Sequence, residues 1–281
     1  MRPVDQFLLI LLKVLPKQLL SRITGFIARI PLPYPVNVLL IRFYSAIFPV
    51  DLTEVELPLS RYGTLQSFFT RKLVPSARPV DQDRQKVLSP VDGRVMVSGG
   101  IREGTLLQAK GWRYGLADLL GDRRDAARFL GGSFTTLYLS PADYHRIHMP
   151  MDGRVQSLRY IPGHLYPVNR FSLHAVENLF LLNERIVLRF ATDAGDLAMV
   201  LVGATNVGKI RVVFDDGQRP LSRSQPFERD YRGEIALKRA EELGRFELGS
   251  TVILIFEKER AVLEAKAGDI VRVGRPVGFI P

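Results

Sequence analysis

A glycine–serine pair near the end of the chain stands directly before a run of β-branched and large apolar residues. The segment reads Leu248-Gly249-Ser250-Thr251 and continues as an apolar run to Phe256. Such a pair usually marks a turn that enters a buried strand. A strained Gly-Ser bond can also cleave itself, because the serine hydroxyl can attack the preceding carbonyl and convert the amide into an ester. Elimination and hydrolysis then leave a pyruvoyl group, and the serine needs a nearby base.

Two of the four histidines lie close together and could supply that base. His145 and His148 share the segment at residues 141–150, and their His-x-x-His spacing could place two imidazoles on a metal. The segment lacks the glutamate and the spacing of a His-Glu-x-x-His metalloprotease, so no metal site is expected. Asp92 lies in a Pro-Val-Asp-Gly segment. Aspartate, histidine and serine can act as orienting acid, general base and nucleophile once the fold brings them together. Two ordinary loop histidines remain the alternative.

These three segments occur together in one enzyme family. Residues 88–95, 141–150 and 248–251 resemble, in content and order, the bacterial pyruvoyl-dependent phosphatidylserine decarboxylases. Residues 183–185 (Asn-Glu-Arg) and 202–205 (Val-Gly-Ala-Thr) resemble further segments of these enzymes. Each segment is weak evidence alone, but the three in this order, with the serine near the C-terminus, are a specific pattern.

The resemblance implies a role for each candidate residue. His148 matches the base of the family, Asp92 matches the acid that orients it, and Ser250 matches the nucleophile of self-cleavage. His145 matches a histidine that donates a proton in the decarboxylation step, a contribution worth about 10²–10⁴-fold. Cleavage between Gly249 and Ser250 leaves the cofactor, a covalent pyruvoyl group derived from Ser250.

The same resemblance implies the reaction and its products. The pyruvoyl ketone forms a Schiff base with the amine of phosphatidylserine, the carboxylate leaves as CO₂, and phosphatidylethanolamine is released. Neither a separate organic cofactor nor a metal is implied. The large chain (residues 1–249) and the small chain (residues 250–281) stay together as a heterodimer. The sequence leaves open whether these pairs assemble into a higher homo-oligomer.

Composition narrows the choice of partner. The chain has 39 basic and 29 acidic side chains, and its formal net charge of +10 favours an anionic partner such as a lipid surface or a nucleic acid. Basic and aromatic residues are not interleaved in the way that a base-stacking platform needs, so no nucleic-acid partner is expected. The absence of cysteine excludes a disulfide, a thiol nucleophile and a thiolate metal site.

The first 48 residues predict a membrane-associating segment. They carry six basic residues against one acid, and no uncharged apolar run reaches the roughly 20 residues of a spanning helix. Residues 17–30 predict an amphipathic helix with one apolar and one basic face. Such a helix could pack on the protein's own core, but its basic face favours a position in the headgroup zone of an anionic membrane. We therefore expect a peripheral protein on the cytoplasmic face of the cell membrane.

The rest of the chain predicts a β-rich α+β fold. Short apolar runs separated by glycine and proline indicate a barrel- or sandwich-like core of short, mostly antiparallel strands, preceded by N-terminal amphipathic helices. We expect a helical membrane-associating segment at residues 1–50 and a catalytic domain at residues 51–281. Short helices are expected at residues 65–73 and 112–120. The expected strands are residues 93–97, 134–139, 154–160, 185–190, 197–202, 208–214, 251–256 and 270–280.

The sequence also contains an internal echo. Residues 90–95 (Pro-Val-Asp-Gly-Arg-Val) recur as residues 150–155 (Pro-Met-Asp-Gly-Arg-Val), and residues 267–274 have a related turn-then-strand pattern. Repeated Asp-Gly hairpins would explain the echo. The pattern is also similar to small barrels that carry lipoyl or biotinyl groups, but those need a lysine at the turn, and neither Asp-Gly turn has one. Asp152, in the second copy, is expected to be structural.

A non-catalytic scaffold that binds membrane lipids is the alternative function. It would share the basic charge and the apolar N-terminal segment, but it has no need for Gly249-Ser250 together with Asp92 and His148. Replacing Ser250 with alanine separates the two functions. The enzyme would then remain a single uncleaved, inactive chain that still binds membranes.

Overall fold

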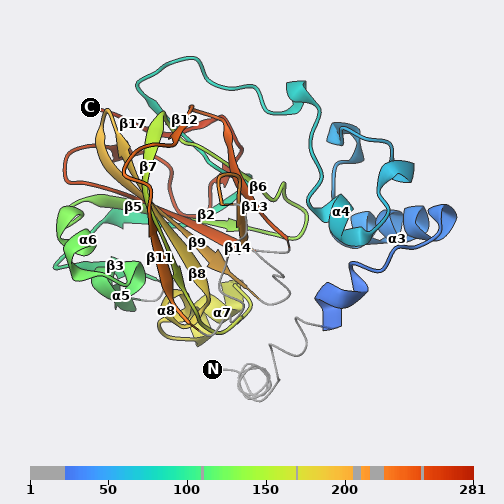
Figure 1. The fold of residues 1–281 in the computed structure, drawn as a ribbon, viewed down its shortest axis with the longest axis horizontal. Helices are drawn as coiled ribbons and strands as arrows, with labels where there is room; N and C mark the ends of the chain where they lie inside the picture. Colours follow the sequence, from blue (N-terminus) through green and yellow to red (C-terminus); the bar gives the residue numbers. More distant parts are fainter. Residues whose placement is uncertain (1–22, 109–110, 169, 205–209, 216–224, 248–249) are drawn as a thin grey trace.

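A β-rich body makes up most of the molecule, and a smaller helical part lies beside it (Figure 1). The computed structural model describes residues 23–108, 111–168, 170–204, 210–215, 225–247 and 250–281. The strand ladders among these residues are antiparallel. The predicted α+β class with an antiparallel, β-rich core is therefore confirmed.

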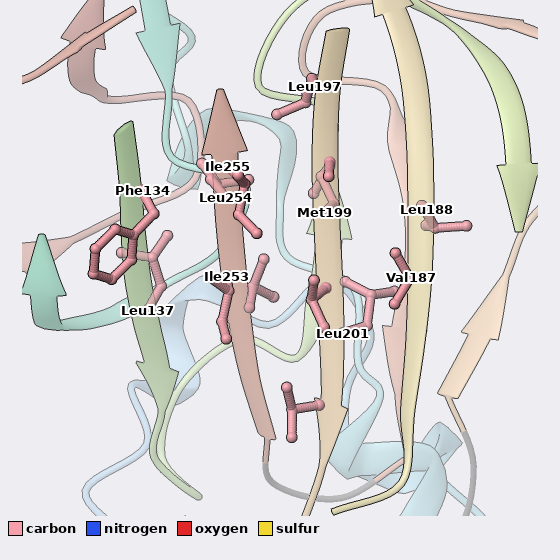
Figure 2. Close-up of a cluster of buried hydrophobic side chains, with 14 of the residues drawn as sticks. Phe134, Leu137, Val187, Leu188, Leu197, Met199, Leu201, Ile253, Leu254 and Ile255 are labelled. Atoms are coloured by element: carbon pink, nitrogen blue, oxygen red, sulfur yellow. The ribbon is translucent and has the colours of Figure 1, made fainter. Parts of the chain in front are cut away.

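The strand that begins at Ser250 lies at the centre of a nine-stranded sheet. β14 (Ser250–Phe256) pairs with β9 (Gly195–Gly203) on one side and with β5 (Ser133–Leu139) on the other. All seven residues of β14 are buried, as its unbroken apolar run predicted. Figure 2 shows its side chains between those of β5 and β9. The order is β11-β7-β8-β9-β14-β5-β2-β16, with β12 beside β7, and the other strands are β2 (Gly93–Gly100), β7 (Gly153–Ile161), β8 (Arg185–Thr192), β11 (Phe227–Asp230), β12 (Ala236–Leu237) and β16 (Ile270–Val271).

Smaller sheets and short helices complete the described part of the body. The sheet that matters most for the site has the order β10-β13-β6, because it joins the histidine segment to the strand that precedes Ser250. Its strands are β10 (Ile210–Val212), β13 (Glu242–Phe246) and β6 (Arg146–His148). The remaining elements are β1 (Lys86–Leu88), β17 (Pro276–Phe279), β15 (Val262–Leu263), β3 (Thr105–Leu107), β4 (Arg113–Gly115), α5 (Leu116–Leu120), α6 (Arg123–Arg128), α7 (Arg170–Ala175) and α8 (Leu179–Leu182).

Three sequence predictions were wrong in detail. The helix expected at residues 65–73 ends at Phe69. The helix expected at residues 112–120 is partly strand, because β4 pairs with β3 and α5 begins only at Leu116. The single strand expected at residues 270–280 is divided into β16 and β17. Gly274 lies between these two strands with φ of +82°, a conformation that interrupts a strand and that glycine adopts readily.

The helical part packs around an apolar cluster of its own. Its main elements are α3 (Tyr34–Ile47) and α4 (Leu65–Phe69), with the 3₁₀ helices η1 (Leu52–Glu54) and η2 (Leu59–Arg61) between them and η3 (Pro75–Ala77) after them. Ile41, Val50, Tyr62 and Phe68 form the cluster. The domain boundary at residue 50 stays a prediction, and Val50 itself packs with residues that follow it.

Only part of the predicted helix at residues 17–30 is described. Residues 23–27 are helical, and residues 17–22 lie outside the described residues. In the part of the chain that the structure describes, no helix has the length and apolar character needed to cross a membrane.

The internal echo corresponds to a pairing pattern that occurs twice. We call residues 88–95 with residues 268–275 the first motif, and residues 148–155 with residues 233–241 the second motif. In both motifs the aspartate and its neighbours bond to a distant segment, so the echo is not a repeated hairpin. The equivalent backbone pairs are Val95 with Gly268 and Asp269 against Val155 with Gly233 and Ile235, and Ser89 with Gly274 and Arg275 against Met149 with Ala240 and Glu241.

The two motifs meet through reciprocal backbone hydrogen bonds. The N–H of Leu88 donates to the carbonyl of Pro150 at 3.0 Å, and the N–H of His148 donates to the carbonyl of Pro90 at 2.8 Å. Such an exchange of equivalent bonds is what an approximate twofold relation produces. It places the segment that carries Asp92 beside the segment that carries His148.

Candidate active site

Ser250 is the first residue of the central strand. Its backbone lies between Leu139 at the end of β5 and Gly203 at the end of β9. The side chain is buried, and its Oγ has no hydrogen-bond partner among the described residues. A buried hydroxyl without a partner is unusual, because leaving such a group unsatisfied costs free energy. The unpaired hydroxyl of Ser250 is therefore a candidate reactive group.

Asp92 is brought to the same end of the sheet by β2. Gly93 opens β2 next to Tyr138 and Leu139, so Asp92 and Ser250 lie on either side of the end of β5. Two strand spacings, about 10 Å, separate the backbone of Ser250 from that of Gly93, the residue after Asp92. A Cβ on Gly93 would lie 2.2 Å from the carbonyl oxygen of Tyr138, so only glycine allows this close approach.

The carboxylate of Asp92 is buried and fully paired. Arg78 donates to both of its oxygens at 2.5–2.9 Å, and the N–H of Val273 donates to Oδ1 at 2.9 Å. Arg78 also donates to both oxygens of Glu54 in η1 at 2.8–2.9 Å. Burial opposes the charge of Arg78, but the two carboxylates outweigh it and raise the pKa of the guanidinium. Arg78 therefore links the helical part to Asp92.

His148 is held by a carbonyl and a phenol. Its Nδ1–H donates to the carbonyl of Ala240 at 2.8 Å, so Nε2 carries the lone pair, and Nε2 lies 3.3 Å from the hydroxyl of Tyr144. Burial lowers the pKa of His148 and keeps the ring neutral, although the negative charges of Glu242 and Asp92 act to raise it. The side chains of Asp92 and His148 are not hydrogen-bonded to each other. The carbonyl of Ala240, and not Asp92, therefore orients the His148 ring in this structure.

His145 is fully buried and stacks on Phe69, with ring centroids 4.0 Å apart. Its Nε2–H donates to the carbonyl of Ser140 at 2.9 Å, so Nδ1 carries a lone pair. Nδ1 has no partner among the described residues. Burial, helped by the positive charge of Arg71, lowers the pKa of His145 to about 3.

One segment, residues 139–148, connects three of the four candidate residues. Leu139 pairs with Ser250, and the carbonyl of the next residue, Ser140, binds His145. The carbonyl of His145 in turn accepts the N–H of Phe246, at the end of β13. β13 also pairs with β6, which ends at His148. The structure therefore gathers the four residues at one end of the sheet, but it does not join Ser250, His148 and Asp92 by hydrogen bonds.

A cavity of about 120 Å³ lies where the helical part meets this end of the sheet. Both parts line it, and most of the side chains around it are polar or charged. Among the described residues, no group of three or more His, Cys, Asp or Glu side chains could hold a metal ion. The lining includes Asp51, Glu54, Arg71 and Arg78 from the residues before β1 and Asp92, Asp143, Tyr144 and Arg272 from the body.

Comparison with known proteins identifies the family. The family profile described as phosphatidylserine decarboxylase matches residues 65–279. The chain belongs to the phosphatidylserine decarboxylase family. It is 42% identical over 278 residues to the phosphatidylserine decarboxylase proenzyme of Myxococcus xanthus (strain DK1622), covering 98% of this chain and 99% of that protein. It is 44% identical over 278 residues to the proenzyme of Anaeromyxobacter sp. (strain K), covering 98% of each chain.

The resemblance read from the three segments is thus confirmed at the level of the family. Phosphatidylserine decarboxylase proenzymes make their pyruvoyl group from one of their own serines. Ser250 fits that chemistry, because its hydroxyl is buried, is free of hydrogen bonds to described residues and stands at the start of the buried central strand.

Sequence reasoning missed three residues at this candidate site. Arg78 binds Asp92 directly, Tyr144 contacts His148, and the buried Arg71 donates from Nη2 to the carbonyl of Ala142 at 3.0 Å. Tyr144 stands next to His145 and could have been included with that segment. Arg71 and Arg78 lie outside the three segments, and only the folded chain brings them to the site.

Proposed function

We propose that this chain is a self-processing phosphatidylserine decarboxylase that forms phosphatidylethanolamine and CO₂ with a pyruvoyl group made from Ser250. The observation that carries the proposal is the buried Ser250 hydroxyl, which has no partner among the described residues and opens the central strand. Family membership over nearly the whole chain supplies the reaction class.

Self-cleavage begins with attack of the Ser250 Oγ on the carbonyl of Gly249. The acyl group moves from nitrogen to oxygen, and the amide becomes an ester with a free amine on residue 250. β-Elimination then expels the Gly249 carboxylate and leaves dehydroalanine, which takes up water and releases ammonia to give the pyruvoyl group. The products are a large chain that ends at Gly249 and a small chain that starts at residue 250.

His148 is the general base in this proposal. Its neutral ring and the lone pair on Nε2 suit it to accept the hydroxyl proton of Ser250. In the observed arrangement Nε2 faces the hydroxyl of Tyr144. The base must therefore exchange Tyr144 for Ser250 as a partner. The negative charge of Asp92 stabilises the imidazolium that forms, and Arg78 keeps that charge in place.

His145 serves the decarboxylation step. Once formed, the pyruvoyl carbonyl supplies an electron sink for the loss of CO₂. The lone pair on His145 Nδ1 can take up a proton and return it to carbon. With its pKa lowered to about 3 the ring is neutral before substrate arrives, and the negative charges of the bound phospholipid headgroup favour protonation.

The helical part is proposed to bind the membrane surface that holds the substrate. The face of α3 that points inward carries Asn37, Ile41 and Ser45, whereas the outward face is apolar apart from Arg42. A helix that buries polar residues and exposes apolar ones indicates that its outer face contacts an apolar partner, such as a membrane, and not water. The exposed large apolar side chains of residues 23–47 are Ile23, Phe26, Ile27, Ile30, Tyr34, Val36, Leu39, Phe43 and Ile47.

This surface supports a peripheral position on the cytoplasmic face, with the helices lying in the headgroup zone of an anionic bilayer. The cavity between the helical part and Asp92 would then receive the phospholipid headgroup from the membrane side. The large and small chains form a heterodimer, which the pairing of β14 with β5 and β9 keeps together after cleavage.

The intact mass of the purified protein under denaturing conditions tests the proposal. We expect two chains split after Gly249, with the small chain lighter than a serine-started peptide by one ammonia. Ser250→Ala should remain one full-length chain without activity on phosphatidylserine vesicles. Ser157→Ala, at another buried serine of the sheet, is the matched control and should mature normally. A wild-type chain that stays intact after long incubation would contradict the proposal.

Membrane binding is tested separately by flotation with phosphatidylserine-containing vesicles. Leu39→Glu and Phe43→Glu place charges on the outward face of α3 and should weaken flotation, while self-cleavage continues. Unchanged flotation of both variants would remove α3 from the membrane surface.

A further inference from the structure

Glu247 is a buried acid three positions before Ser250, held by two arginines from distant parts of the chain. Its carboxylate accepts Arg211 Nε at 2.7 Å and Arg29 Nη2 at 2.9 Å. The side chain of Glu247 is only 6% exposed, whereas that of Arg29 is 46% exposed. Burial acts to raise the pKa of Glu247, but the two arginines outweigh it and lower the pKa. The acid is therefore charged, and both arginines compensate for its burial.

Arg29 belongs to the N-terminal segment with the exposed apolar side chains. Its Nε donates to Gln66 Oε1 at 2.7 Å, and the N–H of Gln66 donates to the carbonyl of Ala28 at 2.9 Å. Ala28 is buried, whereas Phe26 and Ile27 are exposed. This segment therefore docks through its backbone and Arg29, and Arg29 carries the contact across to Glu247.

Glu247 stands between two points that the sheet holds in place. The N–H of Phe246 donates to the carbonyl of His145 at 3.0 Å, and Ser250 is paired on both sides by Leu139 and Gly203. Only three residues, 247–249, connect these points. Glu247 is the last described residue before Ser250, and its two arginines hold the point from which the chain continues to the cleavage bond.

We infer that Glu247 is a positioning residue for self-cleavage, and that Arg29 makes maturation depend on docking of the N-terminal segment. The inference rests on the proposed cleavage at Gly249–Ser250. Attack by the serine needs its Oγ to lie close to the carbonyl carbon in the correct direction. A displacement of about 1 Å can cost about 10²-fold in rate. Losing one arginine leaves the buried charge of Glu247 half compensated, and the segment that leads to the bond shifts toward water.

The cleavage rate of full-length chains made by cell-free synthesis tests this inference. The fraction cleaved is followed on denaturing gels, and the cut is verified by intact mass. Arg29→Gln and Arg211→Gln should each slow cleavage by roughly 10-fold, and Glu247→Gln should slow it by roughly 10- to 100-fold. Arg61→Gln removes the same charge from an exposed position of the helical part and should cleave at the wild-type rate.

Coupling between the residues separates positioning from a general loss of stability. If Arg29 acts through Glu247, the double variant Arg29→Gln with Glu247→Gln should cleave no more slowly than Glu247→Gln alone. Arg29→Lys keeps the charge and should recover most of the rate.

The outcomes are distinct. Cleavage of Arg29→Gln at the wild-type rate, or multiplicative effects in the double variant, would overturn the inference while leaving the proposed function intact. A wild-type chain that never cleaves would instead overturn the proposed function itself. Arg29→Gln could slow cleavage in the chain that carries Ser250 and also lower the melting temperature in the uncleavable Ser250→Ala background. That combined result would make Arg29 a structural residue and not a positioning one.

Discussion

The first and second motifs share a backbone pattern but differ in what their side chains do. In both, the aspartate Oδ1 accepts a backbone N–H, from Val273 for Asp92 and from Arg239 for Asp152. Asp92 is then buried under Arg78, with 7% of its side chain exposed, whereas Asp152 is 36% exposed and pairs with Arg84, itself 80% exposed. The same local sequence therefore gives one buried, paired acid and one surface acid.

At a second pair of equivalent positions, it is the second motif that carries the candidate site residue. Leu88 opens the first motif and is fully buried, whereas the second motif has His148 at this position. The first motif thus contributes Asp92, the proposed acid, and the second contributes His148, the proposed base. The reciprocal bonds of Leu88 with Pro150 and of His148 with Pro90 place the two contributions side by side. The two motifs share one backbone arrangement, which we call the repeated frame. The candidate site residues lie at positions where the side chains of the two motifs differ.

The helical part accounts for much of this asymmetry. It covers the first motif through Glu54 and Arg78, and both residues line the cavity together with Asp92. Asp152 has no such cover among the described residues, since its partners are an exposed arginine and one backbone N–H. A carboxylate that is removed from water acts on its neighbours through a lower dielectric, so the covered acid is the one able to influence a base.

The largest expected difference is that between the cleavage rates of the Asp92→Asn and Asp152→Asn variants. Asp92→Asn should slow self-cleavage by at least about 10²-fold, because it removes the charge that stabilises the His148 imidazolium. Asp152→Asn should cleave within twofold of wild type. The time course of cleavage on denaturing gels measures both. Equal rates for the two variants would mean that the motifs are functionally equivalent.

The arginines over the two aspartates provide the next test, in a Ser250→Ala background that stays uncleaved. Arg78→Gln leaves Asp92 and Glu54 buried without their main partner and should lower the free energy of unfolding by about 2–4 kcal/mol. Arg84→Gln removes a solvent-exposed pair and should cost at most about 0.5 kcal/mol. Urea denaturation monitored by circular dichroism compares the two. Similar costs would contradict the difference in burial.

Giving the second motif the leucine of the first should change the pH dependence of stability. Burial lowers the pKa of His148 below its ordinary 6.5. Below pH 6.5 the unfolded chain therefore takes up a proton that the folded chain does not, and stability is lost as the pH falls. The share of one such histidine is at most about 1.4 kcal/mol per pH unit. In the Ser250→Ala background, His148→Leu should have a correspondingly shallower slope of unfolding free energy between pH 6.5 and pH 5, and an unchanged slope would contradict the assignment.

The smallest effect is expected at the turn that ends each motif. Gly274 and Ala240 both have positive φ, +82° and +64°. Gly274→Ala should lower the free energy of unfolding by about 1–2 kcal/mol, since an added Cβ would also lie 3.2 Å from the carbonyl oxygen of Pro79. Ala240→Gly relieves the same strain and should be neutral or stabilising by up to about 1 kcal/mol. Melting temperatures of the two uncleaved variants give the comparison, and a loss of stability in both would show that the turns are not equivalent.

Local patterns account for what was predicted correctly. The run after Ser250 is apolar without alternation, and a strand with this pattern is buried on both faces, as β14 is. The three segments around Asp92, His148 and Ser250 identified the family, because their residue types and order are properties of the sequence alone. The echo in residues 90–95 and 150–155 predicted repeated Asp-Gly hairpins, and this was wrong, because each copy bonds to a distant segment in the same hydrogen-bond pattern.

Only the tertiary structure decided which of these residues are buried, paired or free. No periodicity connects Arg29 to Glu247, which are 218 positions apart, or places Arg78 over Asp92 and not over Asp152. Ion pairs of this kind depend on which surfaces the folded chain brings together. A sequence pattern records the preferences of a residue and its near neighbours, whereas burial and the partners of a charged group are set by long-range packing. The sequence therefore determined the family and the central strand, and the packing of the helical part against the repeated frame decided how the candidate site is held.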